Sequence, residues 1–251
     1  ISLLYLEQIF LKLKKHNIVR SIRGSGGGYI LFKKAEELKL SEIFFAVDEK
    51  VKTINCNKDS LITLNQKHTS QVIHFKNKKS VQNKLTADAI VSEVKNVGIG
   101  ILAADCAPIL FYDPKKKIIG CAHSGWKGAL NGIIKNTVNK FSELNSNYND
   151  LIAVVGPCIG KKNYKVKEDF FNKFVSQENN NKIFFEKIDN EKFIFDLRGF
   201  INKEILNCGI KNIENLEMDT FEQKEFFYSY RRSVLNKEKD YGRCISVILM
   251  T

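Results

Sequence analysis

Two residues with metal-binding chemistry follow two short apolar segments of this 251-residue chain. Cys106 comes shortly after the segment 98–103, and His123 comes directly after the segment 117–122. Both segments are typical of buried strands, so the two side chains can meet at one edge of a sheet. A third candidate, His68, lies upstream. A thiolate and two imidazoles suit a tetrahedral metal centre that keeps one position for water, as in catalytic zinc sites.

The spacing of these residues by itself favours a simpler interpretation, a buried thiol and two hydrogen-bonded histidines. No C-x-x-C or H-x-x-x-H pair, the usual signature of a metal site, is present. The remaining histidines, His16 and His74, have no motif around them, and we expect both to be ordinary surface or half-buried residues. Asp105, beside Cys106, is a candidate acid/base or a residue that orients His123 through a hydrogen bond, and Asp88 is a weaker candidate of the same kind.

The positive charge of the chain raises the question of nucleic-acid binding. The net charge is +12, but most basic residues are lysines scattered through both halves. Three of the few arginines, Arg231, Arg232 and Arg243, cluster near the C-terminus. Because the guanidinium fork matches phosphate oxygens, this cluster is a better candidate anion site than the diffuse lysines. The alternative is a solvated cluster of charges.

Composition and length narrow the class of protein. With 43% hydrophobic residues, the chain can build a sizeable core in one large domain or two small ones. It has no apolar run of about 18 residues and no signal segment, so we expect no membrane partner. The irregular spacing of six cysteines does not suggest disulfides, and a metal-binding Cys106 must be reduced, so we expect a cytoplasmic protein. Because the chain starts with Ile1, we also expect a fragment or a trimmed sequence.

Strands and helices alternate in most of the chain. Apolar patterns predict strands at 98–103, 118–122, 151–155, 193–195 and 245–249, a helical stripe from 130 to 141, a helix around 201–206 and a loop at 177–182. This order predicts an α/β (mixed α+β) sandwich with a mixed sheet and flanking helices. We expect the helix that contains the apolar stripe to begin just after His123. The free N–H groups at its start would then favour binding of an anion beside the metal.

Seven motifs occur in the order known from one protein family. They are Gln66–His68, Thr86–Ala89, Ala104–Pro108, His123–Gly128, Gly156–Gly160, Phe195–Leu197 and Phe227–Arg232, the last followed by Gly242 and Arg243. From roughly residue 52 onward the chain therefore resembles the multicopper polyphenol oxidoreductase family, also called laccase-domain proteins or peptidoglycan editing factors and now mostly described as purine nucleoside phosphorylases. The resemblance implies a domain over residues 51–251 with metal ligands at His68, Cys106 and His123.

The resemblance also implies an activity. We expect a zinc-dependent phosphorylase that acts on adenosine, inosine, guanosine and methylthioadenosine with phosphate, and that also deaminates adenosine. A metal ion with an open position lowers the pKa of bound water or polarises a substrate oxygen. We expect Asp105, Cys106 and His123 to be catalytic, and Arg231, Arg232 and Arg243 to bind phosphate. Lys127 departs from the family, in which arginine is common at this position.

Other functions remain open for this domain. The family has been described as copper-dependent polyphenol oxidases, but a laccase needs several copper ions and about ten histidines. The chain has four histidines, so we expect zinc, with copper as the alternative metal. A peptidoglycan-editing protein that acts on cell-wall precursors is a further alternative. The nucleobase deaminase signature, with its Pro-Cys-x-x-Cys, is absent, so deamination here would need an unrelated design.

The first fifty residues have a different character. A helical pattern at 2–14 precedes a basic, glycine-rich hairpin at 18–31 and a short helix. The segments Tyr5–Ile9, Val19–Ser21 and Arg23–Tyr29 resemble the Rrf2 family of winged-helix regulators, which implies a DNA-binding function and a nucleic-acid partner. We expect residues 1–50 to be a truncated winged-helix segment, because its supporting helices and cysteine cluster are absent. A join near 48–53 without a linker favours a deletion or assembly artefact over an evolved fusion.

Overall fold

The computed structural model describes residues 3–22, 28–34, 61–77, 85–189 and 191–251. The chain divides into two compact units, residues 1–56 and 57–251. The predicted join near 48–53 and the short helix expected after the hairpin lie outside the described residues. Within the part of the chain that the structure describes, no helix combines the length and the apolar character needed to cross a membrane.

The smaller unit contains a helix and a hairpin, in the predicted order. The helix α1 spans Leu3–Lys15, and the antiparallel strands β1 and β2 span Val19–Ile22 and Gly28–Leu31. The Phe10 ring of α1 stacks on the Tyr29 ring of β2, with 4.5 Å between their centroids. This aromatic contact stabilises the packing of the helix on the hairpin, because stacking removes apolar surface of both rings from water.

The larger unit is built on mixed β-sheets, as the sequence predicts. In its described part, the largest sheet has the strand order β13-β9-β7-β8-β5-β4. Its strands are β4 (Val72–Phe75), β5 (Ala89–Ser92), β7 (Ala107–Asp113), β8 (Ile118–Ser124), β9 (Ile152–Val155) and β13 (Asn212–Asn215). The outer pairs, β4 with β5 and β9 with β13, are parallel, and the inner pairs are antiparallel.

Two smaller sheets and several helices complete this unit. One sheet, β14-β6-β3, contains β3 (Leu61–Thr63), β6 (Gly98–Ala103) and β14 (Cys244–Leu249); the other, β10-β12-β11, contains β10 (Lys165–Lys167), β11 (Phe185–Lys187) and β12 (Lys192–Phe195). The helices are α3 (Trp126–Leu130), α4 (Ile133–Glu143), α5 (Glu168–Val175), α6 (Leu197–Asn207) and α7 (Tyr230–Leu235). Short 3-10 helices span Tyr148–Asp150, Lys161–Asn163 and Asn179–Phe184.

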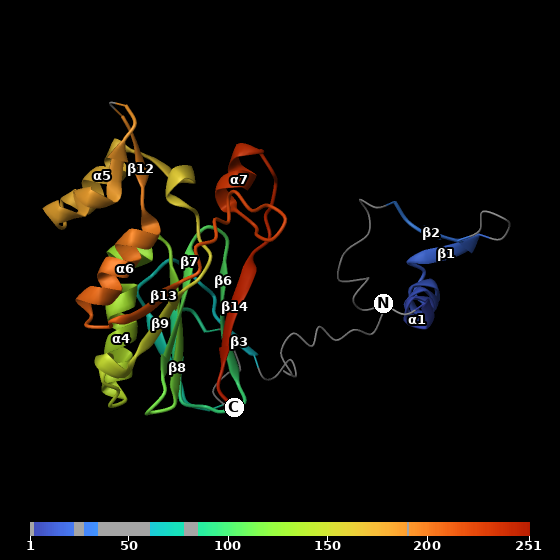
Figure 1. Cartoon of the computed structure of the whole chain (residues 1–251), viewed down its shortest axis with the longest axis horizontal. Coiled ribbons are helices and arrows are strands. Elements are labelled where there is room, and N and C mark those ends of the chain that lie inside the picture. Colours follow the sequence, from blue (N-terminus) through green and yellow to red (C-terminus); the bar gives the residue numbers. More distant parts are fainter. Residues whose placement is uncertain (1–2, 23–27, 35–60, 78–84, 190) are drawn as a thin grey trace. The chain divides into compact units, whose positions relative to one another are not determined.

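The strand β8 lies at the centre of the sandwich, and all of its residues are buried. Its side chains alternate between two cores. Ile118 and Ala122 belong to the core beneath the helices α4 and α6, whereas Ile119 and Cys121 belong to the core shared with the β14-β6-β3 sheet. Figure 1 shows these helices on one side of the large sheet and β6 and β14 on the other. Burial of both faces explains the continuous apolar run that predicted this strand.

Two local expectations were wrong. The helical stripe forms α4, which begins at Ile133 rather than just after His123, because the left-handed backbone of Gly132 (φ 86°) separates it from the short helix α3. The predicted loop at 177–182 contains a 3-10 helix, Asn179–Phe184. The side chain of Asn181 is buried and donates a hydrogen bond to the Phe174 carbonyl at 3.0 Å, which anchors this segment to α5.

Candidate metal centre

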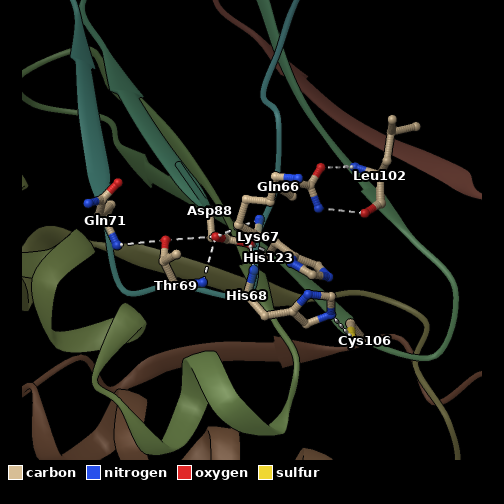
Figure 2. Close-up of polar contacts among 9 residues, drawn as sticks. All are labelled: Gln66, Lys67, His68, Thr69, Gln71, Asp88, Leu102, Cys106 and His123. Atoms are coloured by element: carbon tan, nitrogen blue, oxygen red, sulfur yellow. Dashed lines mark hydrogen bonds and ion pairs between the residues drawn. The ribbon is translucent and has the colours of Figure 1, made fainter. Parts of the chain in front are cut away.

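The three expected metal ligands lie together in the larger unit. Their ligand atoms, from His68, Cys106 and His123, are all within 4.8 Å of one another. Cys106 Sγ is 3.7 Å from His68 Nε2, and the two imidazole rings approach edge to face with centroids 4.7 Å apart. Figure 2 shows the side chains converging from three segments that are distant in the sequence. One soft sulfur and two imidazole nitrogens form a donor set that zinc accepts in catalytic sites.

Strand ends and loops position these side chains. His123 lies near the end of β8, and Cys106 lies in the tight connection between β6 and β7. His68 lies in the loop that follows β3, with a left-handed backbone (φ 57°). The Gln66 side chain exchanges two hydrogen bonds with the backbone of Leu102, at 2.7 and 2.9 Å. This amide continues the pairing of β3 with β6 beyond the end of β3, and so holds the His68 loop against the sheet.

Asp88 connects two of the three candidate ligands. Its Oδ1 atom accepts hydrogen bonds from the His68 backbone N–H and from His123 Nδ1, both at 2.9 Å. Its Oδ2 atom accepts from the backbone N–H of Lys67 at 3.1 Å and from the N–H and hydroxyl of Thr69 at 2.7 and 2.8 Å. Three successive backbone N–H groups thus form a nest around the buried carboxylate (Figure 2).

The ionisation of Asp88 sets the orientation of the His123 ring. Burial by itself would raise the pKa of Asp88, but the hydrogen bonds from His123, Thr69 and Lys67 outweigh it and hold the pKa well below its usual range. An ionised carboxylate only accepts hydrogen bonds, so His123 Nδ1 must carry the proton that it donates. The Nε2 atom of His123 is then the nitrogen with a free electron pair for a metal ion.

The protonation states of the other two candidate ligands, His68 and Cys106, depend differently on a cation. Burial and the nearby His123 lower the pKa of His68, which favours its neutral, ligating form. Burial, reinforced by Asp105, raises the pKa of the Cys106 thiol to about 12. Without a cation this sulfur stays protonated, whereas a coordinating metal ion releases the proton from a thiol. The three residues therefore fit a divalent metal ion as ligands.

Gly125 allows the ligands to pack closely. A Cβ atom at this position would lie 2.6 Å from Cys106 Sγ and 3.2 Å from His68 Cδ2. Both distances are shorter than ordinary van der Waals contacts, so any larger residue would displace a ligand. The sequence motif contains this glycine, but only the tertiary contacts show why a side chain is excluded here.

Asp105 has different partners from those expected. Its carboxylate accepts hydrogen bonds from the Thr220 hydroxyl at 2.7 Å, the Ser229 hydroxyl at 3.0 Å and the Arg231 backbone N–H at 2.6 Å. The residue that bonds to His123 Nδ1 is Asp88, so the weaker of the two candidates has the orienting contact. Asp105 instead ties the C-terminal segment to the loop that carries Cys106. Asp196, within the Phe195–Leu197 motif, caps the helix α6 by accepting a hydrogen bond from the Gly199 N–H at 2.8 Å.

Two cavities meet at the candidate metal centre, and His68 and Cys106 line both of them. The larger has a volume of about 560 Å³ and is lined by aromatic and cationic side chains, among them Trp126, Lys127, Tyr164, Tyr230, Arg231 and Tyr241. The smaller, about 340 Å³, is lined by His123, Lys67, Gln66 and Arg243. The aromatic walls escaped sequence reasoning, although Trp126 and Tyr230 fall within two of the motifs.

The three clustered arginines divide into two kinds. Arg231 lines the larger cavity and Arg243 the smaller one. Arg232, expected to bind phosphate, donates instead to the backbone carbonyls of Thr220, Phe221 and Phe227 at 2.5–2.8 Å. Its guanidinium therefore braces the segment before α7. The sequence could not separate these roles, because all three side chains have the same chemistry.

Solved structures share this fold. Protein YfiH of Bacillus licheniformis superposes with a TM-score of 0.74 and 25% identity, over 84% of this chain and 82% of that one. A Neisseria meningitidis protein superposes with a TM-score of 0.69 and 24% identity, over 94% and 91% of the two chains. These likenesses confirm the predicted fold class.

Sequence comparisons agree with the resemblance seen in the motifs. A purine nucleoside phosphorylase of Rickettsia conorii is 35% identical over 191 residues, which are 76% of this chain and 78% of the relative. One of Haemophilus influenzae is 34% identical over 189 residues, 74% and 73% of the two chains. The Rrf2 family of iron-dependent transcriptional regulators matches residues 1–88. With a family match over residues 46–251 and these relatives, the chain belongs to the family described as multi-copper polyphenol oxidoreductase laccase.

Proposed function

We propose that this chain is a zinc-dependent purine nucleoside phosphorylase that also deaminates adenosine. One observation carries the proposal: the candidate ligands His68, Cys106 and His123 lie together, and the first two line a cavity of about 560 Å³ with aromatic and cationic walls. This volume falls within the range of small-molecule sites and accommodates a nucleoside. The relatives named as purine nucleoside phosphorylases support the same activity.

Different residues of the site would bind the metal ion and the phosphate. His68, Cys106 and His123 would hold the zinc ion, which when bound supplies Lewis acidity at the cavity wall. Asp88 keeps the His123 ring in its ligating orientation. Arg231 and Arg243 offer guanidinium forks to phosphate oxygens from the two cavities, while Asp105 positions the Arg231 backbone.

The aromatic wall of the larger cavity explains why we expect several purine nucleosides to be substrates. Adenosine, inosine, guanosine and methylthioadenosine share a planar purine and a ribose. The rings of Trp126, Tyr164 and Tyr241 offer apolar faces to a purine without depending on its substituents. Because the thiol of Cys106 must remain reduced to bind a metal ion, we also propose a cytoplasmic location for the protein.

The decisive experiment measures metal content and nucleoside turnover on the purified chain. Elemental analysis should give close to one zinc ion per chain. Incubation with adenosine and inorganic phosphate should release adenine together with ribose 1-phosphate, and a smaller amount of inosine from deamination. Chromatography separates these products, and omission of phosphate should abolish adenine release while sparing inosine.

A pair of histidine variants serves as the control. His123→Ala should lose both zinc and turnover. His74→Ala should retain both, because His74 lies on β4 and faces Glu93 at 3.2 Å, away from the candidate ligands. Zinc-free protein without turnover would contradict the proposal. Copper in place of zinc, with oxidation of phenols and no nucleoside turnover, would favour the polyphenol oxidase alternative.

The smaller unit supports a second candidate function, binding of duplex DNA. The Rrf2 match and the order of helix α1 and the β1–β2 hairpin favour it. Arg20 on β1 is exposed and can contact phosphate. We expect any such binding to weaken with salt and with the Arg20→Ala and Arg23→Ala changes, as measured by fluorescence anisotropy of a labelled duplex. Unchanged binding in both variants would contradict a role for the hairpin.

A further inference from the structure

A third cavity adjoins the one assigned to the nucleoside. Its volume is about 310 Å³, and Trp126, Tyr164 and Arg231 line both cavities. It lies between β10 and α5, and its lining does not include the candidate metal ligands. In Figure 1, α5 and α7, the helix of Arg231, lie at the same end of the larger unit. The two cavities therefore adjoin along these three shared side chains, which are called the neck below, and the second cavity is called the outer groove.

The outer groove is strongly basic. Lys165, Lys167, Lys173 and Arg231 line it, with Asp169 as the acidic residue. The three lysine side chains are exposed, but Lys173 is ion-paired with Asp169 at 3.6 Å. Lys165 and Lys167 are therefore the lysines best placed to reorient towards an anion. Several cations around one hollow create a positive potential that attracts a phosphate-bearing molecule.

The neck between the two cavities is held in place by aromatic packing. The Trp126 ring packs on Phe170 with centroids 4.8 Å apart. The Arg231 guanidinium lies 5.4 Å from the centre of the Tyr164 ring and donates a hydrogen bond to the Lys165 carbonyl at 2.7 Å. A guanidinium has five N–H donors, so this bond leaves donors for a ligand. The neck is thus preorganised rather than formed by exposed lysines alone.

Cations approach the Trp126 ring from both cavities. Lys127, which lines the nucleoside cavity, has its Nζ atom 5.5 Å from the ring centre. Lys173, which lines the outer groove, has its Nζ atom 5.6 Å from the same ring. A ligand that extends from one cavity to the other would pass Trp126 with a positive charge on either side.

We propose that the outer groove binds the phosphate chain of a purine nucleoside 5′-phosphate whose nucleoside part occupies the larger cavity. This inference rests on the proposed function, since it takes the larger cavity as the nucleoside site. Lys165, Lys167 and Lys173 neutralise the phosphate charge, and Arg231 at the neck donates to the oxygens nearest the ribose. The chain then binds phosphorylated nucleosides more tightly than the nucleosides themselves.

A single tryptophan makes the test independent of turnover. Trp126 is the one tryptophan of the chain and lines both cavities, so its fluorescence reports binding in either of them. Adenosine, adenosine 5′-monophosphate, adenosine 5′-diphosphate and inorganic phosphate are titrated separately into the zinc-loaded chain of 251 residues. We expect the monophosphate and diphosphate to bind more tightly than adenosine, and this preference to shrink as salt is added.

Matched charge reversals locate the phosphate. The double variant Lys165→Glu/Lys167→Glu on β10 should lose the preference, by up to about fivefold in affinity for each lysine replaced, while its affinity for adenosine stays unchanged. The double variant Lys135→Glu/Lys140→Glu on α4 has the same net charge and should keep the preference, because these lysines line none of the three cavities.

Two results would overturn the inference: affinities for the nucleotides no higher than for adenosine, or a preference that survives in the groove variant. Failure of the proposed function has a different signature. The chain would then fail to convert adenosine with phosphate, whereas the fluorescence titrations would still rank the affinities of nucleosides and nucleotides.

Discussion

The buried carboxylate of Asp88 contacts two of the three candidate metal ligands directly. It accepts from the ring of His123 and from the backbone of His68, and the neighbouring N–H groups of Lys67 and Thr69 complete its surroundings. A residue of this kind fixes both the tautomer of one ligand and the path of the loop that carries another. Its loss should therefore weaken metal binding although it is not a ligand.

Asp88→Asn tests this role. The asparagine keeps the size of the side chain, but its amide nitrogen cannot accept the hydrogen bonds that one carboxylate oxygen accepts. We expect affinity for zinc, measured by competition with a chelator, to fall roughly 10- to 100-fold. Asp113→Asn is the matched control, since Asp113 is also buried and accepts several hydrogen bonds but lies outside the site. Equal zinc affinity in both variants would refute the role of Asp88.

Gly125→Ala tests the close packing around Cys106. The new methyl group would meet Cys106 Sγ at 2.6 Å, so the ligands must separate. Overpacking of this kind costs about 1–3 kcal/mol, and we expect zinc binding to weaken by roughly tenfold or more. Gly128→Ala is the control, because a Cβ atom there meets its neighbours at an ordinary 3.4 Å. Competition titrations on both variants, with circular dichroism to verify folding, would separate the two cases.

At the scale of elements, the hairpin of β7 and β8 determines where His123 lies. The seven paired positions run from Ala107 with Ser124 to Asp113 with Ile118. At the turn, the Asp113 side chain accepts from the backbone N–H groups of Lys115 and Lys116 at 2.8 and 2.9 Å and from the Ser146 hydroxyl. This carboxylate closes the hairpin at the end opposite the metal centre.

The stability provided by Asp113 should depend on pH. Burial by itself would raise its pKa, but the bonds from Ser146, Lys116 and Lys115 outweigh it and lower the pKa. The stabilisation is therefore complete above the ordinary carboxyl pKa of about 4 and is lost as the pH falls through the lower folded value. Asp113→Asn should cost about 1–3 kcal/mol in the free energy of unfolding at neutral pH. Urea titrations should show a smaller difference in acid, and a constant difference would contradict this origin.

At the scale of the whole molecule, the two units have separate cores. Both large hydrophobic clusters, and all three candidate ligands, belong to the unit that spans residues 57–251. The smaller unit has its own contacts between α1 and the β1–β2 hairpin. The family matches also differ for the two ends of the chain.

A chain lacking residues 1–56 tests this independence. We expect the shortened protein to fold and to bind zinc with the affinity of the full chain, because its metal ligands and the Asp88 nest come from the larger unit. Its unfolding midpoint and zinc content are measured beside those of the full chain. A fragment that folds but binds zinc much more weakly would show that the first 56 residues contribute to the site.

Local sequence patterns determined much of the fold. The apolar run of 118–122 predicted β8 because a strand buried on both faces needs apolar residues without alternation. Apolar runs also located β6, β9, β12 and β14 within one or two residues. The metal ligands His68, Cys106 and His123 were predicted from the ordered motifs of a known family, because the spacing of these residues alone predicted no metal site.

The tertiary structure decided which polar groups meet. Asp105 pairs with Ser229 and Arg231 across separations of 124 and 126 residues, and Arg232 turns to backbone carbonyls rather than to a cavity. Periodicity extends over a few turns of helix or strand, so it carries no information about such distant partners. Hydrogen-bond partners depend on how the chain folds back on itself and on which groups burial leaves in need of a partner. The sequence thus determined the elements and the ligand chemistry, and the fold assigned each polar side chain its role.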